Sequence, residues 1–549
     1  MKISKSVLGG VTVATASALV LVGCSSSGSE TDTSASTDGS ASTGDAIIIT
    51  NGSEPQNPLI PVATNETGGG KIVDALWAGL VYYDGDGAAH NEVAESITSD
   101  DSQTFTVTLK EGWTFTDGTP VLAHNFVDAW NWGADLANAE LAYNSYFFEQ
   151  IEGFSWDESV PEMSGLEVVD DLTFTITLAN ANAEFPLSLG YSAFYPMPDS
   201  FLEAEDKAAW GAAPVGNGIY TLADAADWQH DVQIELGVNP DYMGERELAN
   251  DGLKIVFYAT QDAAYADLLA GNVDVIDGIP DSAIATFETD LGDRAVNQPA
   301  AIFQSFTIPE RLEHFSGEEG NLRRQALSMS INRDEITDVI YQGTRTPASD
   351  FTSPVISGWS DSVPGSEVLE YNPEKAAELW AEADAINAWT GTFQLGYNAD
   401  GGHQTWVDAV VNSIKNTLGI EAEGAPYPTF AEFRTDISNG VIETAFRTGW
   451  QADYPSLENF LGPLYYTGAG SNDGDYSSEA FDTLIDEGRT ASDPETAIEK
   501  FQEAQEVLFQ DLPAIPLWYS NVTGGYAETV SNVVFDWHSV PLFYEITKN

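Results

Sequence analysis

Several short stretches in the first half of the chain alternate apolar and polar residues at period two. The segments TFTVTL (104–109) and LTFTITL (172–178) place apolar side chains on one face and threonines on the other. This alternation is typical of half-buried antiparallel strands. The more continuously apolar segment 46–50 predicts a buried strand, and the segment 253–260 predicts another strand.

Helical spacing appears between the two alternating segments, where Phe126, Ala129 and Trp130 recur on one face. A second helix is predicted for QDAAYADLLA, because Gly271 directly after it is a typical helix end. We therefore expect a β-rich module with inserted helices over about residues 80–190, followed by a region of mixed strands and helices.

The chain becomes more helical after residue 320. Asn332 followed by Glu335 resembles a capping box, and Ile336, Val339 and Ile340 then form an apolar stripe. Two further helix starts combine an N-cap residue with a proline, Asn372-Pro373 and Asp493-Pro494. Near the C-terminus the segments 514–522 and 533–547 again predict strands.

The first residues have the pattern of an export signal. Lys2 and Lys5 precede an apolar run over 7–22, which is short for a membrane-spanning helix. The run ends in Leu-Val-Gly-Cys24, which resembles the lipoprotein box of bacteria, where the cysteine receives diacylglycerol after cleavage before it. Residues 1–23 are therefore predicted to be a lipoprotein signal peptide, with an uncleaved anchor helix as the alternative.

Cys24 is the single cysteine, so it has no disulfide partner within the chain. Residues 24–45 contain mostly Ser, Thr, Gly and Asp, which predicts a flexible tether. Together these features predict a protein held by a lipid anchor on the outer face of the cell membrane.

The charge balance restricts the partners. The chain has 20 Lys and Arg against 86 Asp and Glu, a formal net charge of −66. Such a protein repels nucleic acid phosphates and anionic lipid headgroups, so we expect no nucleic acid partner. The acids are spread along the whole chain, which favours a solvated acidic surface over an acidic interaction arm.

Enzyme signatures are absent from the sequence. It contains neither G-x-S-x-G nor H-E-x-x-H, and the GGGK segment at 68–71 departs from a phosphate-binding loop because Asn65 and Ile72 replace required residues. With six scattered histidines we expect no transition-metal site and no cofactor. Carboxylate pairs carry no information in so acidic a chain. The sequence therefore predicts a binding protein, with a surface glycoside hydrolase as a distant alternative.

Six longer segments give a specific resemblance. They occur in this order: LKEGWTFTDGTPVLAHNFVDAW (109–130), APVGNGIYTL (213–222), NPDYMGE (239–245), LRRQALSMSINRDEITDVIYQGTRTPASDFTSP (322–354), YNPEKAAELWAEA (371–383) and FRTGWQADYPSLENFL (446–461). Together they resemble the family 5 extracellular solute-binding proteins, the dipeptide and oligopeptide receptors of ABC importers. The resemblance extends from about residue 47 to the end.

The resemblance implies an α/β fold of the two-lobed periplasmic-binding-protein type, which closes over its ligand by a hinge motion. The first lobe would contain a main subdomain and an extra β-rich subdomain. The implied ranges are 46–79, 192–301 and 521–549 for the main subdomain, 80–191 for the extra subdomain and 302–520 for the second lobe. A monomer is expected.

The resemblance also implies ligand-binding residues. Asp453 matches the acid that binds a peptide's N-terminal ammonium, and Arg447 and His403 match positions that face the carboxyl end. Trp450 and Tyr454 would form pocket walls beside the same strand. In the first lobe Asn65 is the nearest match to a contact near the amino end, and Phe303 is a candidate second wall.

Each of these residues has a structural alternative. Arg447 and Asp453 can form an ion pair with each other or with other groups, His403 can be an exposed loop residue, and Trp450 and Tyr454 can belong to the core. The predicted function is capture of di- or oligopeptides and their delivery to a membrane permease. The alternative within the same class is a non-peptide ligand: an oligosaccharide, a nickel complex or haem.

Overall fold

The computed structural model describes residues 46–491 and 493–549, so the predicted signal peptide, most of the tether and Cys24 lie outside the described residues. Within this part of the chain one mixed sheet of twelve strands forms the framework. Ten strands follow one another in the order β16 (Glu421–Tyr427), β15 (Thr392–Asn398), β17 (Ala445–Gln451), β13 (Ala295–Thr307), β18 (Ala514–Tyr526), β12 (Val275–Ile276), β1 (Ile47–Gly52), β11 (Gly252–Phe257), β10 (Gln233–Val238) and β8 (Tyr220–Thr221). The two remaining strands are β14 (Arg345–Pro347), paired with β18, and β9 (Trp228–Gln229), paired with β10.

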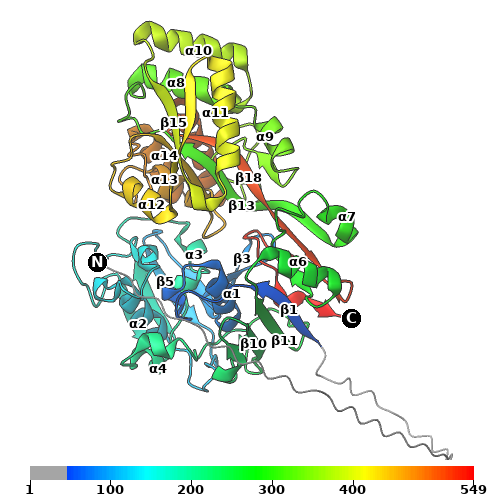
Figure 1. Ribbon diagram of the computed structural model, residues 1–549. Helices are drawn as coiled ribbons and strands as arrows, with labels where there is room; N and C mark the ends of the chain where they lie inside the picture. Colours follow the sequence, from blue (N-terminus) through cyan, green and yellow to red (C-terminus); the bar gives the residue numbers. More distant parts are fainter. Residues whose placement is uncertain (1–45, 492) are drawn as a thin grey trace, which may run out of the picture. The chain divides into compact units, whose positions relative to one another are not determined.

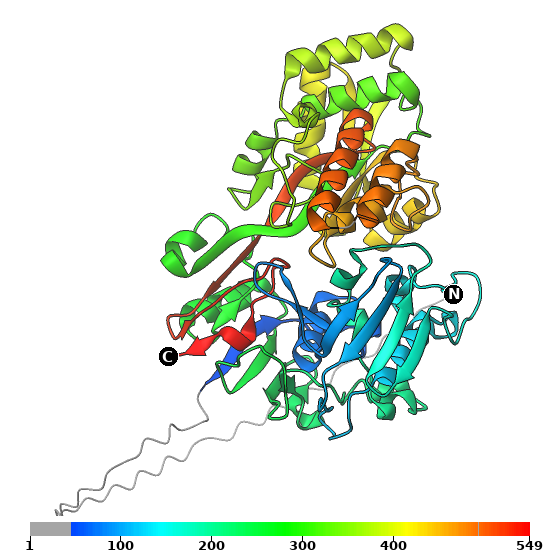
Figure 2. The ribbon, with the colours of Figure 1, turned by 180° about the vertical axis from the view of Figure 1, so that it is seen from behind.

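The two longest strands, β13 and β18, connect two separate groups of buried side chains. Ala300 on β13 and Val522 on β18 belong to the core of the first lobe. Phe303 and Tyr519, on the same two strands, belong to a core of the second lobe. Figures 1 and 2 show these two strands continuing from one lobe into the other. The predicted two-lobed α/β fold is confirmed, while the exact lobe boundaries, which fall inside these strands, stay a prediction.

The first lobe also contains a four-stranded antiparallel sheet. Its order is β4 (Ala94–Thr98), β5 (Thr104–Leu109), β7 (Thr173–Thr177) and β6 (Leu166–Asp170). The two alternating segments are thus paired strands, as predicted, with Phe105 opposite Ile176. Helix α2 (Ala123–Ala134) packs on them: the rings of Phe126 and Phe174 stack with centroids 5.8 Å apart.

Helices surround the sheet in both lobes. In the first lobe they are α1 (Thr67–Leu76), α3 (Phe185–Ser188), α4 (Asp199–Leu202), α5 (Lys207–Trp210), α6 (Gln261–Ala270) and α7 (Phe287–Leu291). In the second lobe they are α8 (Gly317–Met329), α9 (Arg333–Val339), α10 (Pro373–Ile386), α11 (Gln404–Leu418), α12 (Phe430–Ser438), α13 (Glu458–Tyr465), α14 (Glu479–Arg489) and α15 (Pro494–Asp511). None of the helices described here is long and apolar enough to cross a membrane.

The predicted helix ends are confirmed. The side chains of Asn372 and Asp493 accept backbone N–H groups of α10 and α15 at 3.0 and 2.9 Å. Gly271 ends α6 with a φ of 74°, a left-handed conformation that glycine adopts without strain.

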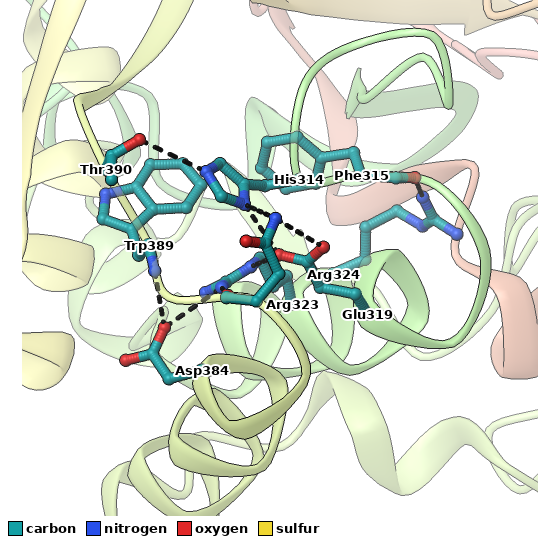
Figure 3. Close-up of polar contacts among 9 residues, drawn as sticks. His314, Phe315, Glu319, Arg323, Arg324, Asp384, Trp389 and Thr390 are labelled. Atoms are coloured by element: carbon teal, nitrogen blue, oxygen red, sulfur yellow. Dashed lines mark hydrogen bonds and ion pairs between the residues drawn. The ribbon is translucent and has the colours of Figure 1, made fainter.

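A buried arginine holds α8 against α10. Arg323, whose side chain is fully buried, donates to Glu319 at 2.9 Å and to Asp384 at 3.0 Å, and its guanidinium lies 4.5 and 5.1 Å from the rings of Trp380 and Trp389. His314 Nδ1 lies 2.7 Å from a carboxylate oxygen of Glu319 and so joins the same cluster (Figure 3). Both acids and both rings are supplied by the protein, so this cation has a structural role.

Two details of the sequence prediction are wrong. Val339 is 71% exposed, so the apolar stripe of α9 is narrower than predicted. The segment 533–547 is mainly loop: only β19 (Val530–Ser531) and β20 (Thr547–Lys548) pair at its ends. The carboxylate of Asp536 accepts the N–H groups of His538 and Val540 at 2.9 and 2.8 Å, and this turn replaces a strand.

Candidate functional site

Strand β17 has one edge that is mostly unpaired in the described chain. It pairs with β13 from Phe446 to Gln451, but with β15 only at Ala445 and Phe446. Beyond these two residues no strand of the described chain pairs with its second edge. The N–H of Ala452 donates to Ala301 at 2.9 Å, so by alternation the backbone groups of Gly449 and Gln451 point away from β13. An extended chain can therefore pair with this edge.

Asp453 follows this edge directly and has an unusual environment. Its backbone N–H donates to Asn459 Oδ1 at 2.8 Å, and Asn459 Nδ2 lies 3.4 Å from its carboxylate. No described residue forms an ion pair with Asp453. Burial raises the pKa of this carboxyl to about 7. A desolvated carboxylate without a cation of its own is suited to bind a ligand's ammonium group.

A cavity of about 610 Å³ lies beside β17, mostly within the second lobe, and will be called the strand cavity. Three predicted residues line it: Asn65, Arg447 and Trp450. The guanidinium of Arg447 donates to Asn398 Oδ1 at 2.9 and 2.6 Å and lies 5.2 Å from the ring of Phe430. It forms no ion pair with Asp453, so the structure does not support the alternative that these two residues pair with each other.

The strand cavity also contains polar groups that sequence reasoning missed. Arg434 pairs with Asp473 through two contacts of 2.6 and 2.7 Å. The hydroxyl of Thr448 lies 2.8 Å from that of Ser305 and 3.2 Å from that of Thr307. These groups bond to one another, and the charge of Arg434 is balanced by the protein itself.

A second cavity of about 310 Å³ contains Asp453 and will be called the acidic cavity. Asn65, in the loop before α1, lines this cavity as well as the strand cavity. Three more carboxylates line it: Glu66, which accepts a backbone N–H as the cap of α1, Asp74 from α1 and Asp536 from the C-terminal loop. Desolvation inside the cavity raises the pKa of Asp74 to about 6 and that of Asp536 to about 7. Neither acid has a local sequence signal, because the fold brings them together from opposite ends of the chain.

Three predicted residues line neither cavity. Tyr454 is buried, and its hydroxyl donates to Glu458 at 2.6 Å. Its side chain points away from the cavity that Asp453 lines, since neighbouring side chains of an extended segment point in opposite directions. Phe303 is fully buried and packs against Phe351 and Tyr519. His403 precedes α11, where its Nδ1 accepts the indole N–H of Trp406 at 3.1 Å.

Known proteins resemble this chain over most of its length. The family model of bacterial extracellular solute-binding proteins, family 5 middle, matches residues 88–472. Oligopeptide-binding protein OppA of Bacillus subtilis is 23% identical over 496 residues, covering 87% of this chain and 88% of that protein. Periplasmic oligopeptide-binding protein OppA of Haemophilus influenzae is 27% identical over 487 residues, covering 86% and 87%.

Solved structures share the fold. The Escherichia coli murein tripeptide binding protein MppA matches with a TM-score of 0.73 at 20% identity, over 91% of this chain and 98% of that chain. Haemophilus influenzae OppA in complex with the peptide RPPGFSPFR matches with a TM-score of 0.72 at 24% identity, over 92% and 99%. The family model covers well over half of the sequence, and the chain therefore belongs to the family 5 bacterial extracellular solute-binding proteins.

Proposed function

We propose that this protein is the peptide receptor of an ABC importer, which captures di- or oligopeptides outside the cell and delivers them to a membrane permease. The observation that carries the proposal is Asp453, a desolvated carboxylate without an ion-pair partner among the described residues, placed directly after the open edge of β17. The proposal is supported by relatives that are named oligopeptide-binding proteins and that align with most of this chain.

We expect the protein to recognise the backbone of the peptide and its two charged ends separately. The peptide backbone pairs with Gly449 and Gln451 as an added strand, which accepts any sequence. Asp453 binds the ammonium at the amino end. Arg447 lies six residues earlier, up to about 20 Å along an extended chain, and faces the carboxyl end. Trp450 provides an apolar wall between these ends.

Closure of the two lobes completes the site. Asn65 belongs to the first lobe and lines both cavities, so a ligand on β17 gains contacts from both lobes only when they approach. Contacts made in one state alone shift the equilibrium toward that state. The closed, loaded receptor is the form that the permease recognises, and we expect it to act as a monomer.

The receptor is held at the membrane by lipid on Cys24, which lies outside the described residues. Cys24→Ser should move the protein from the membrane fraction to the medium or the soluble extracellular fraction. A variant that remains in the membrane fraction would contradict the lipid anchor. Ser27→Ala, in the predicted tether, is the matched control and should stay with the membrane.

Mass spectrometry of small molecules released from the purified protein tests the ligand class. Peptides with free amino ends are expected in the released material. Sugars, a nickel complex or haem without peptides would overturn the proposal in favour of another ligand of the same receptor class. Hydrolysis of a glycoside by the protein would overturn the receptor assignment itself.

A further inference from the structure

The acidic cavity holds more negative charge than one ammonium group requires. Asp74, Asp453 and Asp536 all line it, and none forms an ion pair with a described residue. Desolvation raises the pKa of each. The ammonium of a free-amine peptide would pair with one of these three carboxylates. Asp74, which accepts the hydroxyl of Tyr195, and Asp536, which accepts two backbone N–H groups, would remain without a cation.

The cations at the wall of the cavity are already engaged elsewhere. Lys71 pairs with Asp277, and Arg246 pairs with the buried Glu92 at 2.7 Å. Neither Asp277 nor Glu92 lines the cavity. The ion pairs of both wall residues therefore lie outside the cavity. The charge of Arg246 still acts on Asp74 and lowers its pKa, whereas burial raises the pKa of Asp453 and Asp536 with no cation opposing it.

Asp453 and Asp536 lie on chain segments that are joined through one residue. The N–H of Ala301 donates to the carbonyl of Trp537 at 3.0 Å, and the carbonyl of Ala301 accepts the N–H of Ala452 at 2.9 Å. Gln451 adds a second link, from its side-chain amide to the carbonyl of His538 at 3.3 Å. The two carboxylates thus approach the cavity from adjacent segments.

An independent observation concerns Tyr544. Its side chain lines the cavity and is only 9% exposed, and its hydroxyl, which makes no hydrogen bond with a described residue, keeps accessible surface there. Arg246 already lies over the rings of Tyr82 and Tyr544, at 5.6 and 5.5 Å, so among these three rings that of Tyr191 is the aromatic face left to a ligand. This hydroxyl and the carboxylates form an acceptor-rich lining, which suits a ligand with several N–H donors and a positive charge.

We infer that the acidic cavity selects peptides whose first residue is lysine or arginine, with the α-ammonium on Asp453 and the side-chain cation held by Asp536, Asp74 and the hydroxyl of Tyr544. This inference rests on the proposed function, because it assigns the charge preference of the same ligand. The side chains of lysine and arginine carry three and five N–H donors, respectively. These donors can bond to the carboxylates of Asp74 and Asp536 and to the Tyr544 hydroxyl, which a peptide with an apolar first side chain would leave without a donor.

Calorimetric titration of the full chain with two tripeptides tests this assignment. Lys-Ala-Ala and norleucine-Ala-Ala differ in the side-chain ammonium and have similar apolar length. We expect the protein to bind the lysine peptide at least about tenfold more tightly. Asp536→Asn combined with Asp74→Asn should bring the ratio close to one, because both assigned partners of the side-chain ammonium become neutral amides.

Asp86→Asn is the control, because Asp86 is exposed and lies outside the cavity. Equal affinity of the unmodified protein for the two peptides would overturn the basic-residue preference and leave the peptide receptor intact. A lysine preference that survives the double variant would overturn the assigned carboxylates. Failure to bind either peptide, or any other free-amine peptide, would overturn the proposed function and this inference with it.

Discussion

The two cavities differ in how their charges are balanced. In the strand cavity the charge of Arg434 is paired with Asp473, and the guanidinium of Arg447 is hydrogen-bonded to the neutral amide oxygen of Asn398. In the acidic cavity Asp453, Asp74 and Asp536 have no ion-pair partner among the described residues. A charge that the protein already balances contributes less to ligand binding than one left uncompensated. We therefore expect most of the end-recognition free energy to arise at the amino end of the ligand.

Removing the uncompensated charge should have the largest effect. Asp453→Ala is expected to weaken binding of a free-amine tripeptide by at least about 100-fold, close to 3 kcal/mol, because the desolvated ammonium loses its counter-charge. N-acetylated tripeptide, which carries no ammonium, should change far less. Calorimetric titration of both peptides measures the difference. Equal losses for the two would remove Asp453 from the role of amine partner.

The pH dependence should follow the same carboxyl. Only ionised Asp453 attracts the ammonium, and its pKa in the free protein is about 7. Affinity for a free-amine peptide should therefore fall by about tenfold for each pH unit below 7 and level off above it. The Asp453→Asn variant serves as the reference and should show a much smaller slope over pH 5–8, due to Asp74 and Asp536, which titrate in the same cavity. A slope of unchanged size in that variant would assign the titration to these other groups.

The ionised carboxyl of Asp453 should lower the unfolding free energy of the ligand-free protein. A carboxyl pKa raised from 3.8 to about 7 means that the folded state holds its proton more tightly than the unfolded state. Stability then falls as the pH rises from about 4 to 7, and the full penalty remains above 7. Asp453→Asn should raise the unfolding free energy of the ligand-free protein at pH 8 by about 1–2 kcal/mol, after allowance for water near this half-buried group.

Denaturant unfolding at pH 8 and at pH 4 checks this expectation, since the gain should nearly vanish at pH 4. Asp86→Asn, which replaces an exposed acid, should change neither value by more than about 0.5 kcal/mol. A gain of equal size at both pH values would indicate a packing effect of the amide.

The smallest effect is expected in the strand cavity. Arg447→Met should weaken binding of a peptide with a free carboxyl end by about threefold to tenfold, because the guanidinium already bonds to Asn398 and lies against Phe430. The corresponding peptide amide should bind both proteins similarly. A loss as large as that of Asp453→Ala would reverse the proposed difference between the two ends.

Local pattern predicted the strands and helix ends well and the wall residues poorly. Segments 104–109 and 172–178 are strands because period-two alternation is a local property that survives folding. Segment 533–547 is mainly loop because the side chain of Asp536 bonds to backbone N–H groups that a strand would need. Phe303 and Tyr454 are aromatic residues on or next to the strands that border the strand cavity, and the sequence predicted both as ligand-pocket walls. In the folded protein both side chains are buried in the core.

The sequence alone determined the export pattern, the main elements, the family resemblance and the placement of Arg447 and Asp453 around one strand, since these depend on residues near one another in the chain. Only the tertiary structure decided that Asp74, Asp453, Asp536 and Tyr544 share one cavity. It also decided that the three carboxylates form no ion pair with a described residue, because pairing between distant segments depends on the folded sheet and on where each scarce cation is engaged.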